Sequence, residues 1–225
     1  MHEILPPEDI SQLIQRTRTI AGMQLSDLAT SLDIKIPENL KREKGWVGQL
    51  VEKLLGATAG NKAEPDFTHL GVELKTIPVD SNGKPCESTY VCVVPLRNIT
   101  GLYWDNSLVK AKLNHVLWVP VEADKNIPLA NRRLGRGILW QPDKNTEATL
   151  ARDYNEFIDR IALGQVESIT ADQGEILQIR PKAANASALT TGIGENGQSI
   201  QTLPRGFYLR PFFTKQILRQ WQKGS

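Results

Sequence analysis

Apolar residues recur at helical spacing in three long stretches of the chain, and each stretch predicts an amphipathic helix. The three stretches are residues 8–21, 45–56 and 147–163. The second has the densest apolar face and ends at Gly56, a residue type that commonly terminates helices. Shorter helices are expected after Ser26, a residue type favoured at helix N-caps, and over residues 214–221.

Runs rich in β-branched and aromatic residues lie between these helices and predict strands. The expected strands cover residues 72–77, 89–96, 115–121, 175–180 and 207–210. Residues 80–85 separate the first two strands, and Asn82-Gly83 within them is the dipeptide that most favours a hairpin turn. Helices that flank a run of strands predict an α/β or α+β fold.

The composition is that of an ordinary globular protein. Apolar residues make up 40% and charged residues 23% of the 225 positions, which excludes a disordered chain, a collagen-like chain and a coiled-coil rod. This length favours one domain with a sizeable core. Turn-rich residues 97–107 and 142–146 are expected to hinge two lobes, covering about residues 20–105 and about residues 106–225.

Charge and targeting signals are weak. The 27 Lys and Arg against 25 Asp and Glu give a net charge of +2, so a nucleic-acid surface would have to come from local clustering. No apolar run approaches the roughly 18 residues of a membrane span, and residues 1–8 have no apolar signal core. Cys86 and Cys92 have neither zinc-knuckle nor disulfide-framework spacing. We therefore expect a cytoplasmic protein with no membrane partner.

The most informative chemistry lies in residues 64–75. Side chains alternate along a strand, so Glu73 and Lys75 are expected on one face while Leu74 points into the core. A turn at Leu70-Gly71 would bring the carboxylate of Asp66 back beside Glu73. Two adjacent carboxylates repel each other unless a divalent cation lies between them. Oxygen ligands favour Mg²⁺ or Mn²⁺, and the sequence has no His/Cys cluster that would favour zinc.

Lys75 would then stand beside the metal, where its ammonium can hold an attacking water and offset charge developing on a phosphate. The alternative is an ordinary Glu/Lys pair on a surface strand with an unrelated Asp in a loop.

Two other sequence patterns give weaker support for a function. Residues 192–197 match G-x-G-x-x-G but lack the strand-then-helix context of a dinucleotide site, so a turn is expected. The Arg132-Arg133-Leu-Gly-Arg136 cluster fits phosphate contact and a solvated patch equally well.

The Pro65-Asp66 and Glu73-x-Lys75 pattern resembles the nuclease superfamily that includes many type II restriction enzymes. The wider sequence resembles the MutH family of strand-nicking endonucleases of methyl-directed mismatch repair. The similarity is spread over seven segments, residues 37–48, 54–60, 66–78, 116–120, 163–167, 178–185 and 203–209. It implies a restriction-endonuclease-like fold, a mixed sheet flanked by helices in a single domain over residues 1–225, with duplex DNA in a cleft between the two lobes.

The resemblance also implies roles for individual residues. Asp66, Glu73 and the carbonyl of Leu74 would bind Mg²⁺, with Mn²⁺ and Ca²⁺ as alternative occupants, and Lys75 would be the catalytic lysine. Glu52, which the helical pattern places just past the edge of the apolar face, would support the metal or its water shell. Lys44 and Lys112 match family lysines that lie near the DNA backbone; without the resemblance, both would read as solvated surface residues.

Sequence recognition is expected on the C-terminal side. Arg180 can read guanine O6 and N7 with two hydrogen bonds, and it is followed by Pro181 and by Lys182, which would contact a base or a phosphate. Tyr208 resembles the family residue beside the methylatable adenine, where a packed ring would reject an N6-methyl group. Glu87 and Tyr90 lie in a loop expected to approach DNA; Tyr90 departs from the phenylalanine usual in the family.

Together the resemblance predicts an enzyme that nicks the unmethylated strand at hemimethylated GATC sites in double-stranded DNA. MutL, the mismatch-repair ATPase, is the expected activating partner. A monomer is expected, because one active site suits a cut in one strand. Two alternatives remain open from the sequence: a restriction endonuclease that cuts both strands at GATC, and a DNA-binding module without catalysis.

Overall fold

The structure, a computed structural model, describes residues 4–38, 45–60, 62–183 and 185–222. Within these ranges the chain forms two compact units. The first draws on Met1–Glu87, Asn114–Gln141 and Lys215–Ser225, and the second on Ser88–Leu113 and Pro142–Thr214. The units therefore interleave along the chain, whereas the sequence suggested one division near residue 105. The reason is strand pairing, since residues 114–141 return to complete the sheet of the first unit.

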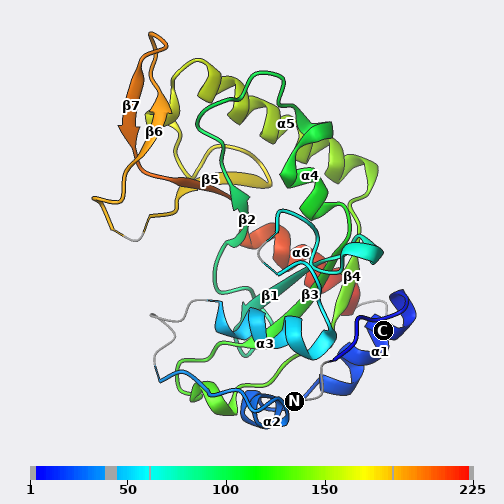
Figure 1. The fold of residues 1–225 in the computed structure, drawn as a ribbon. Helices are drawn as coiled ribbons and strands as arrows, with labels where there is room; N and C mark the ends of the chain where they lie inside the picture. Colours follow the sequence, from blue (N-terminus) through cyan, green and yellow to red (C-terminus); the bar gives the residue numbers. More distant parts are fainter. Residues whose placement is uncertain (1–3, 39–44, 61, 184, 223–225) are drawn as a thin grey trace. The chain divides into compact units, whose positions relative to one another are not determined.

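The first unit contains a three-stranded sheet of order β1-β3-β4 (Figure 1). Strand β1 (Glu73–Val79) pairs in parallel with β3 (Val116–Glu122), and β4 (Ile138–Trp140) is antiparallel to β3. Its helices are α1 (Ile10–Ile20), α2 (Leu25–Ser31), α3 (Trp46–Leu55) and most of α6 (Pro211–Gln222). Strand β3 is the central strand. The side chains of its first four residues, Val116–Val119, are apolar and fully buried, as expected for a strand covered on both faces.

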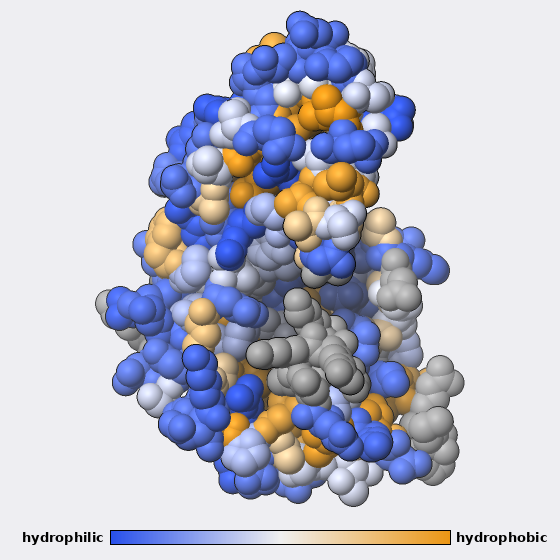
Figure 2. Space-filling model, turned by 90° about the vertical axis from the view of Figure 1, so that its left-hand side faces the viewer, coloured by the Kyte–Doolittle hydropathy of each residue, from blue (hydrophilic) through white to orange (hydrophobic). Residues whose placement is uncertain are grey.

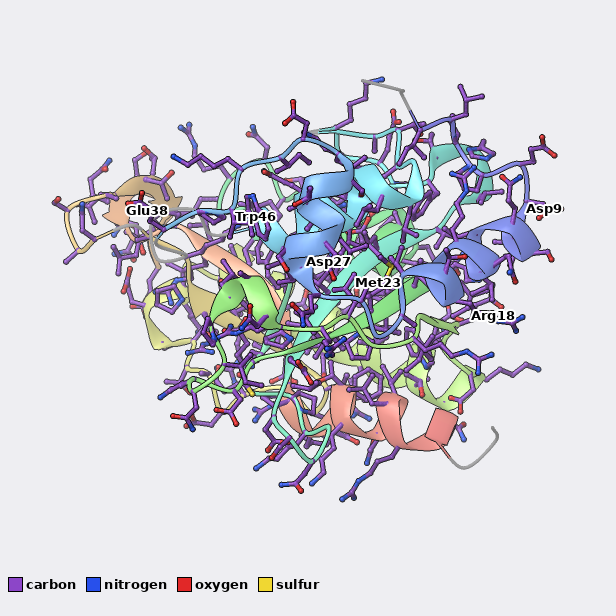
Figure 3. The ribbon with its side chains drawn as sticks, turned by 90° about the horizontal axis from the view of Figure 1, so that it is seen from below. Asp9, Arg18, Met23, Asp27, Glu38 and Trp46 are labelled. Atoms are coloured by element: carbon purple, nitrogen blue, oxygen red, sulfur yellow. The ribbon has the colours of Figure 1, made fainter. Side chains whose placement is uncertain are left out.

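Helices α1, α2 and α3 supply the apolar core of the first unit. Asp9 caps α1 by accepting a hydrogen bond from the backbone of Gln12 at 2.7 Å, and Figure 3 shows it at the start of that helix. Trp46, labelled at the start of α3, is 7% exposed and belongs to the same core. Gly56 ends α3 in the left-handed conformation at φ 80°, as predicted from its position after the apolar stripe.

The second unit contains an antiparallel sheet of order β2-β8-β5 and a separate two-stranded hairpin. The sheet strands are β2 (Thr89–Val93), β8 (Arg205–Leu209) and β5 (Leu177–Pro181), and the hairpin consists of β6 (Thr190–Ile193) and β7 (Ser199–Thr202). Its helices are α4 (Leu108–Leu113) and α5 (Lys144–Ala162). Short 3-10 turns cover Trp104–Asn106 and Val166–Ser168 here, and Thr68–Leu70 and Leu129–Asn131 in the first unit.

Helix α5 covers one face of the second unit's sheet. Phe207 of β8 packs against Tyr154 and Phe157 of α5, with ring centroids 5.4 and 6.4 Å apart. Phe207 is 1% exposed. The opposite face of the same sheet carries polar and half-buried side chains. Figure 2 shows a largely hydrophilic molecular face on which apolar patches are small and separate.

The predicted α/β class is confirmed, and the helices expected over residues 8–21, 45–56 and 147–163 all form. Several helix starts differ from prediction; α6, for example, begins at Pro211 rather than at residue 214. Gln24 rather than Ser26 precedes α2, and Ser26 lies inside that helix. Residues 142–146 were expected to be a loop, but α5 begins at Lys144 because Asp143 caps it through the backbone of Thr146.

The hairpin prediction at Asn82-Gly83 was right about the turn and wrong about the strands. Asp80 and Lys84 close the turn with a backbone hydrogen bond of 2.9 Å. The flanking strands β1 and β2 nevertheless belong to different sheets. Strand β1 instead pairs with β3, some 40 residues later, and helix α3 packs against the resulting sheet. No helix among the described residues is long and apolar enough to cross a membrane.

Candidate functional site

A tight turn before β1 places the carboxylate of Asp66 at the start of that strand. Gly71 adopts φ 63° and reverses the chain, so that Phe67 and Val72 exchange backbone hydrogen bonds of 2.9 and 3.3 Å. The Oδ2 atom of Asp66 accepts a hydrogen bond of 2.7 Å from the backbone N–H of Leu74. The predicted return of Asp66 towards the strand is therefore confirmed.

Glu73 and Lys75 lie side by side on β1, as strand alternation predicts. The Nζ atom of Lys75 is 2.5 Å from Oε1 of Glu73, and their side chains are 12% and 3% exposed. Leu74 between them packs into the core of the first unit. A carboxylate this deeply buried is stable only when it is paired or bound to a cation, and Lys75 supplies one such charge.

Helix α3 packs against β1 and carries Glu52 (Figure 1). A Cβ atom added to Gly48 would lie 3.8 Å from Oγ1 of Thr76, so the Gly48 side of α3 faces the strand. Glu52 follows Gly48 by four residues and therefore lies on the same side of the helix. Glu52 is half-buried. The helical register therefore places Glu52 on the side of α3 that faces β1.

The donor set of this cluster consists of oxygen atoms. Among the described residues no group of three or more His, Cys, Asp or Glu is arranged to hold a metal ion by itself. Zinc, which usually takes three or four such side chains, does not fit this arrangement. Mg²⁺ does fit, because it binds through one or two carboxylates and keeps water and substrate phosphate as its remaining ligands. Asp66, Glu73 and the Leu74 carbonyl can supply that share.

The second unit gathers the residues predicted to recognise DNA on one face of its sheet. In the register of the strands, Tyr208 lies opposite Tyr90 on one side and Gln178 on the other, and Gly206 lies opposite Arg180. These residues share a face because side chains alternate and Phe207 points to α5. We call the face that carries Tyr90, Gln178, Arg180 and Tyr208, together with Lys182 and Ser88, the reading face.

Aromatic rings and cations are interleaved on the reading face. The rings of Tyr90 and Tyr208 meet edge to face with centroids 5.4 Å apart. The Nζ atom of Lys182 lies 3.3 Å from the centroid of Tyr90, and Cζ of Arg180 lies 5.8 Å from the centroid of Tyr208. Such contacts hold cations in place without neutralising their charge.

Burial shifts two pKa values on the reading face. It raises the pKa of the Tyr90 hydroxyl, and the positive charge of Lys112 partly opposes that shift. It lowers the pKa of the Lys182 ammonium. Lys112, on the short helix α4, is thereby placed in the electrostatic neighbourhood of Tyr90, in the same unit.

Ser88 and Gln178 belong to this site, although no sequence pattern singled out Ser88. The Oγ atom of Ser88 accepts hydrogen bonds from Nε2 of Gln178 at 2.9 Å and from Nη1 of Arg180 at 3.0 Å. Gln178 was detectable in principle, because it precedes Arg180 by two residues on a predicted strand and must share its face. Ser88 reaches both only through tertiary structure.

The remaining predicted DNA-binding residues fall in different places. Pro181 is exposed and ends β5. Glu87 is exposed and belongs to the first unit, one residue before the second unit begins. Lys44 lies outside the described residues. The structure therefore brings Tyr90, Lys112, Arg180, Lys182 and Tyr208 into one unit and does not group Glu87 with them.

Two weaker sequence signals have structural explanations. Arg132 donates to the carbonyl of Ile127 at 3.1 Å, and Arg133 donates to the carbonyl of Gly22 at 2.5 Å, so both serve to fix backbone segments. Residues 194–197 form the turn between β6 and β7, closed by a 2.8 Å bond from the N–H of Gly194 to the carbonyl of Gln198. The turn is confirmed, but a strand rather than a helical segment precedes it.

Comparison with known proteins agrees with this geometry. The family model described as DNA mismatch repair enzyme MutH matches residues 55–153, a segment that contains Asp66, Glu73 and Lys75. The DNA mismatch repair protein MutH of Shewanella oneidensis is 56% identical over 220 residues, which cover 98% of this chain and 99% of that protein. The MutH protein of Shewanella baltica has the same identity and coverage. The chain belongs to the MutH family.

Membership of the MutH family explains the mixed α/β architecture, which is of the restriction-endonuclease-like type. MutH enzymes are nucleases of DNA mismatch repair, so the chain is an enzyme that acts on DNA. The agreement extends over nearly the whole chain and therefore includes both units. We call Asp66, Glu73 and Lys75 the acidic cluster on β1. The acidic cluster on β1 and the reading face thus belong to one MutH protein rather than to a fused module.

Proposed function

We propose that the chain is a Mg²⁺-dependent endonuclease that nicks the unmethylated strand of double-stranded DNA at hemimethylated GATC sites. The observation that supports it most is the cluster at the start of β1, where Asp66 turns back to Leu74 and Lys75 contacts a buried Glu73. Pairs of acids with an adjacent lysine are suited to phosphodiester hydrolysis, because one cation site and one proton donor are needed beside the phosphate.

Asp66, Glu73 and the Leu74 carbonyl would hold Mg²⁺; Mn²⁺ and Ca²⁺ fit the same oxygen donors. When bound, the ion lowers the pKa of a coordinated water and stabilises charge on the phosphate oxygens. Lys75 donates a hydrogen bond from Nζ, which orients the attacking water and offsets negative charge in the transition state. Glu52, on the side of α3 that faces β1, would accept hydrogen bonds from water molecules bound to the ion.

The reading face supplies the sequence preference. Arg180 carries two parallel N–H donors that match O6 and N7 of guanine in the major groove. Lys182 and Lys112 supply positive charge for the phosphate backbone, whose contribution depends on salt. Tyr208 stands beside the adenine position, where a ring that is already packed against Tyr90 leaves little space for an N6-methyl group.

The acidic cluster on β1 and membership of the MutH family also support two further features of the proposal. The chain acts as a monomer, since one active site cuts one strand. MutL activates it, which compensates for the weak DNA affinity expected from a net charge of +2. Both are tested by nicking rate as a function of enzyme concentration and of added MutL at physiological salt.

The deciding experiment is a nicking assay on a circular duplex with one GATC site and strand-resolved products. With Mg²⁺ and MutL, we expect nicked circles cut in the unmethylated strand of the hemimethylated substrate, and no cutting of the fully methylated one. Lys75→Ala should reduce the rate at least about a hundredfold, whereas Lys125→Ala, an exposed lysine of the first unit, should not change it.

Other products would contradict the proposal in recognisable ways. Rapid conversion to linear DNA would indicate a restriction endonuclease that cuts both strands. Binding to GATC with no cleavage under any metal would indicate a DNA-binding module. Full activity of the Lys75→Ala variant would remove the acidic cluster on β1 from the chemistry.

A further inference from the structure

A single hydroxyl connects the two outer strands of the second unit's sheet. Ser88 immediately precedes β2, and Gln178 and Arg180 lie on β5, which is separated from β2 by β8. The Oγ atom of Ser88 accepts one bond from each of these side chains, at 2.9 and 3.0 Å. A serine hydroxyl has two acceptor lone pairs, so both are used here.

The two donors differ in how firmly they are held. Gln178 is 5% exposed and is therefore fixed by its surroundings, whereas Arg180 is exposed. An exposed arginine normally samples many rotamers and must lose that freedom on binding. Here the guanidinium is restrained by Ser88 on one side and by the ring of Tyr208, 5.8 Å from Cζ, on the other.

This restraint matters because an arginine reads guanine through two parallel hydrogen bonds from one planar group. If that plane is tilted, one of the two bonds is lost. A side chain already ordered in the free protein costs less entropy to order on binding and keeps its geometry. The contact with Ser88 uses Nη1, which leaves the remaining N–H donors of the guanidinium for DNA.

We propose that Ser88, itself fixed by Gln178, is a positioning residue that orients Arg180 for guanine recognition. The inference rests on the proposed GATC endonuclease function and adds a determinant of its specificity. Ser88 is not expected to take part in phosphodiester cleavage, since Asp66, Glu73 and Lys75 belong to the other unit. Its removal should therefore change which DNA is cut more than the Mg²⁺ requirement of cutting.

The test compares nicking of a GATC duplex with nicking of the same duplex containing 7-deazaguanine, which lacks the N7 acceptor. The wild-type chain should lose about fivefold or more in rate on the modified site. Ser88→Ala should cut the normal site about two- to tenfold more slowly and should be nearly indifferent to the modification. Ser88→Thr, which keeps the hydroxyl, should restore the wild-type preference.

Two controls separate positioning from a general structural effect. Ser199→Ala removes an exposed hydroxyl from the β6–β7 hairpin and should leave both rates unchanged. In an Arg180→Lys background, where the planar fork is gone, adding Ser88→Ala should have no further effect on guanine preference. A structural defect would instead lower rates equally in both backgrounds.

The outcomes distinguish this inference from the function on which it rests. If the wild-type chain nicks and discriminates against 7-deazaguanine but Ser88→Ala keeps the full penalty, the role of Ser88 is refuted and the endonuclease stands. If Ser88→Ala and Ser88→Thr lose the preference equally, the hydroxyl is not the determinant, and the inference is again refuted. If the wild-type chain does not nick at all, the proposed function itself has failed.

Discussion

At the scale of residues, the acidic cluster on β1 brings two carboxylates and one ammonium group into a small volume. Asp66 is half-buried and Glu73 is 2% exposed, so their carboxylates are poorly solvated. Lys75 compensates part of this charge, and a bound divalent ion would compensate more. Ligand binding to the folded state raises its stability in proportion to the logarithm of ligand concentration.

Magnesium should therefore stabilise the wild-type fold. We expect the Tm to rise with added Mg²⁺ in the wild-type chain and to stay constant in Asp66→Asn, which lacks one ligand charge. Thermal unfolding with and without Mg²⁺, with Asp27→Asn as a control on α2, measures this directly. An equal rise in Asp66→Asn and the wild-type chain would show that Asp66 is not a ligand.

Gly206 makes room for the two tyrosine rings of the reading face. A Cβ atom at this position would come within 2.9 Å of Cε2 of Tyr208 and 3.0 Å of Cε2 of Tyr90. Contacts this short force the rings to move. The residue also lies directly opposite Arg180 in the sheet, so ring movement would disturb the guanidinium as well.

Gly206→Ala should consequently weaken GATC preference while costing only about 1 kcal/mol of stability, at the low end of overpacking effects, because side chains can give way. Gly48→Ala is the matched control. Gly48 lies inside α3, and a Cβ atom there would meet only Oγ1 of Thr76 on β1, at 3.8 Å. Because alanine favours a helix more than glycine does, the stability of the chain should rise by about 0.5 kcal/mol with unchanged specificity. Urea unfolding and nicking of sites with one altered base pair measure both effects.

At the scale of elements, Asp153 joins helix α5 to strand β5. This side chain is 3% exposed, and its Oδ2 atom accepts hydrogen bonds of 2.9, 2.8 and 2.9 Å from the N–H groups of Glu175, Ile176 and Leu177. Because one carboxylate binds three consecutive backbone amides, it fixes where β5 begins. It therefore also fixes the position of Arg180 on that strand. No sequence pattern singled out Asp153.

Asp153→Ala should destabilise the chain by about 3 kcal/mol or more, since two buried amides and one partly buried amide lose their acceptor. Asp153→Asn keeps a neutral oxygen acceptor and should lose about half as much. Arg152→Ala, which breaks an exposed ion pair with Glu175, should cost less than about 1 kcal/mol. Equal losses in Asp153→Ala and Arg152→Ala would show that the buried carboxylate does not hold β5.

His115, just before β3, should make stability depend on pH. Its carbonyl accepts the N–H of Glu73 at 2.9 Å, and burial lowers the pKa of its imidazole below the usual 6.5. The unfolded chain therefore binds a proton at a higher pH than the folded chain. The contribution of the neutral imidazole is complete above about pH 6.5 and is lost as the pH falls below it.

The unfolding free energy of the wild-type chain should thus fall more steeply between pH 7.5 and 5.5 than that of His115→Gln. Urea unfolding at several pH values gives the difference between the two proteins, in which shared carboxylate effects cancel. His69→Gln provides a second histidine variant for comparison. Parallel curves for the wild-type chain and His115→Gln would show that His115 does not titrate differently on folding.

At the scale of the whole molecule, the residues proposed for catalysis and those proposed for DNA recognition belong to different units. The acidic cluster on β1 lies in the first unit, and the reading face lies in the second. Each unit is assembled from segments far apart in the chain. In the first unit β1 pairs with β3, and in the second unit β8 joins β2 to β5. The acidic cluster on β1 leads to a prediction about assembly.

The 25.1 kDa chain should sediment as a monomer. Its nicking rate should rise in direct proportion to enzyme concentration, because a single active site is sufficient for one cut. Sedimentation with and without a GATC duplex, combined with the rate measurements, tests this. A second-order dependence on enzyme, or a stable dimer on one site, would contradict the single-site description.

The sequence by itself determined features that depend on near neighbours in the chain. Strand alternation placed Glu73 and Lys75 together, Gly71 allowed the turn that returns Asp66, and the apolar stripe ended α3 at Gly56. These are local consequences of backbone geometry and hydrophobic periodicity. The family resemblance added expected roles for residues whose local pattern was neutral, such as Arg180 and Tyr208.

Only the tertiary structure decided which strands pair and which distant side chains meet. Asn82-Gly83 formed its turn, yet β1 and β2 separated into different sheets, because β1 pairs with β3 in the sheet against which helix α3 packs. Ser88 meets Gln178 and Arg180 across some 90 residues of sequence. Long-range pairing is selected by the total apolar surface that the whole fold buries, and no short window of sequence contains that sum.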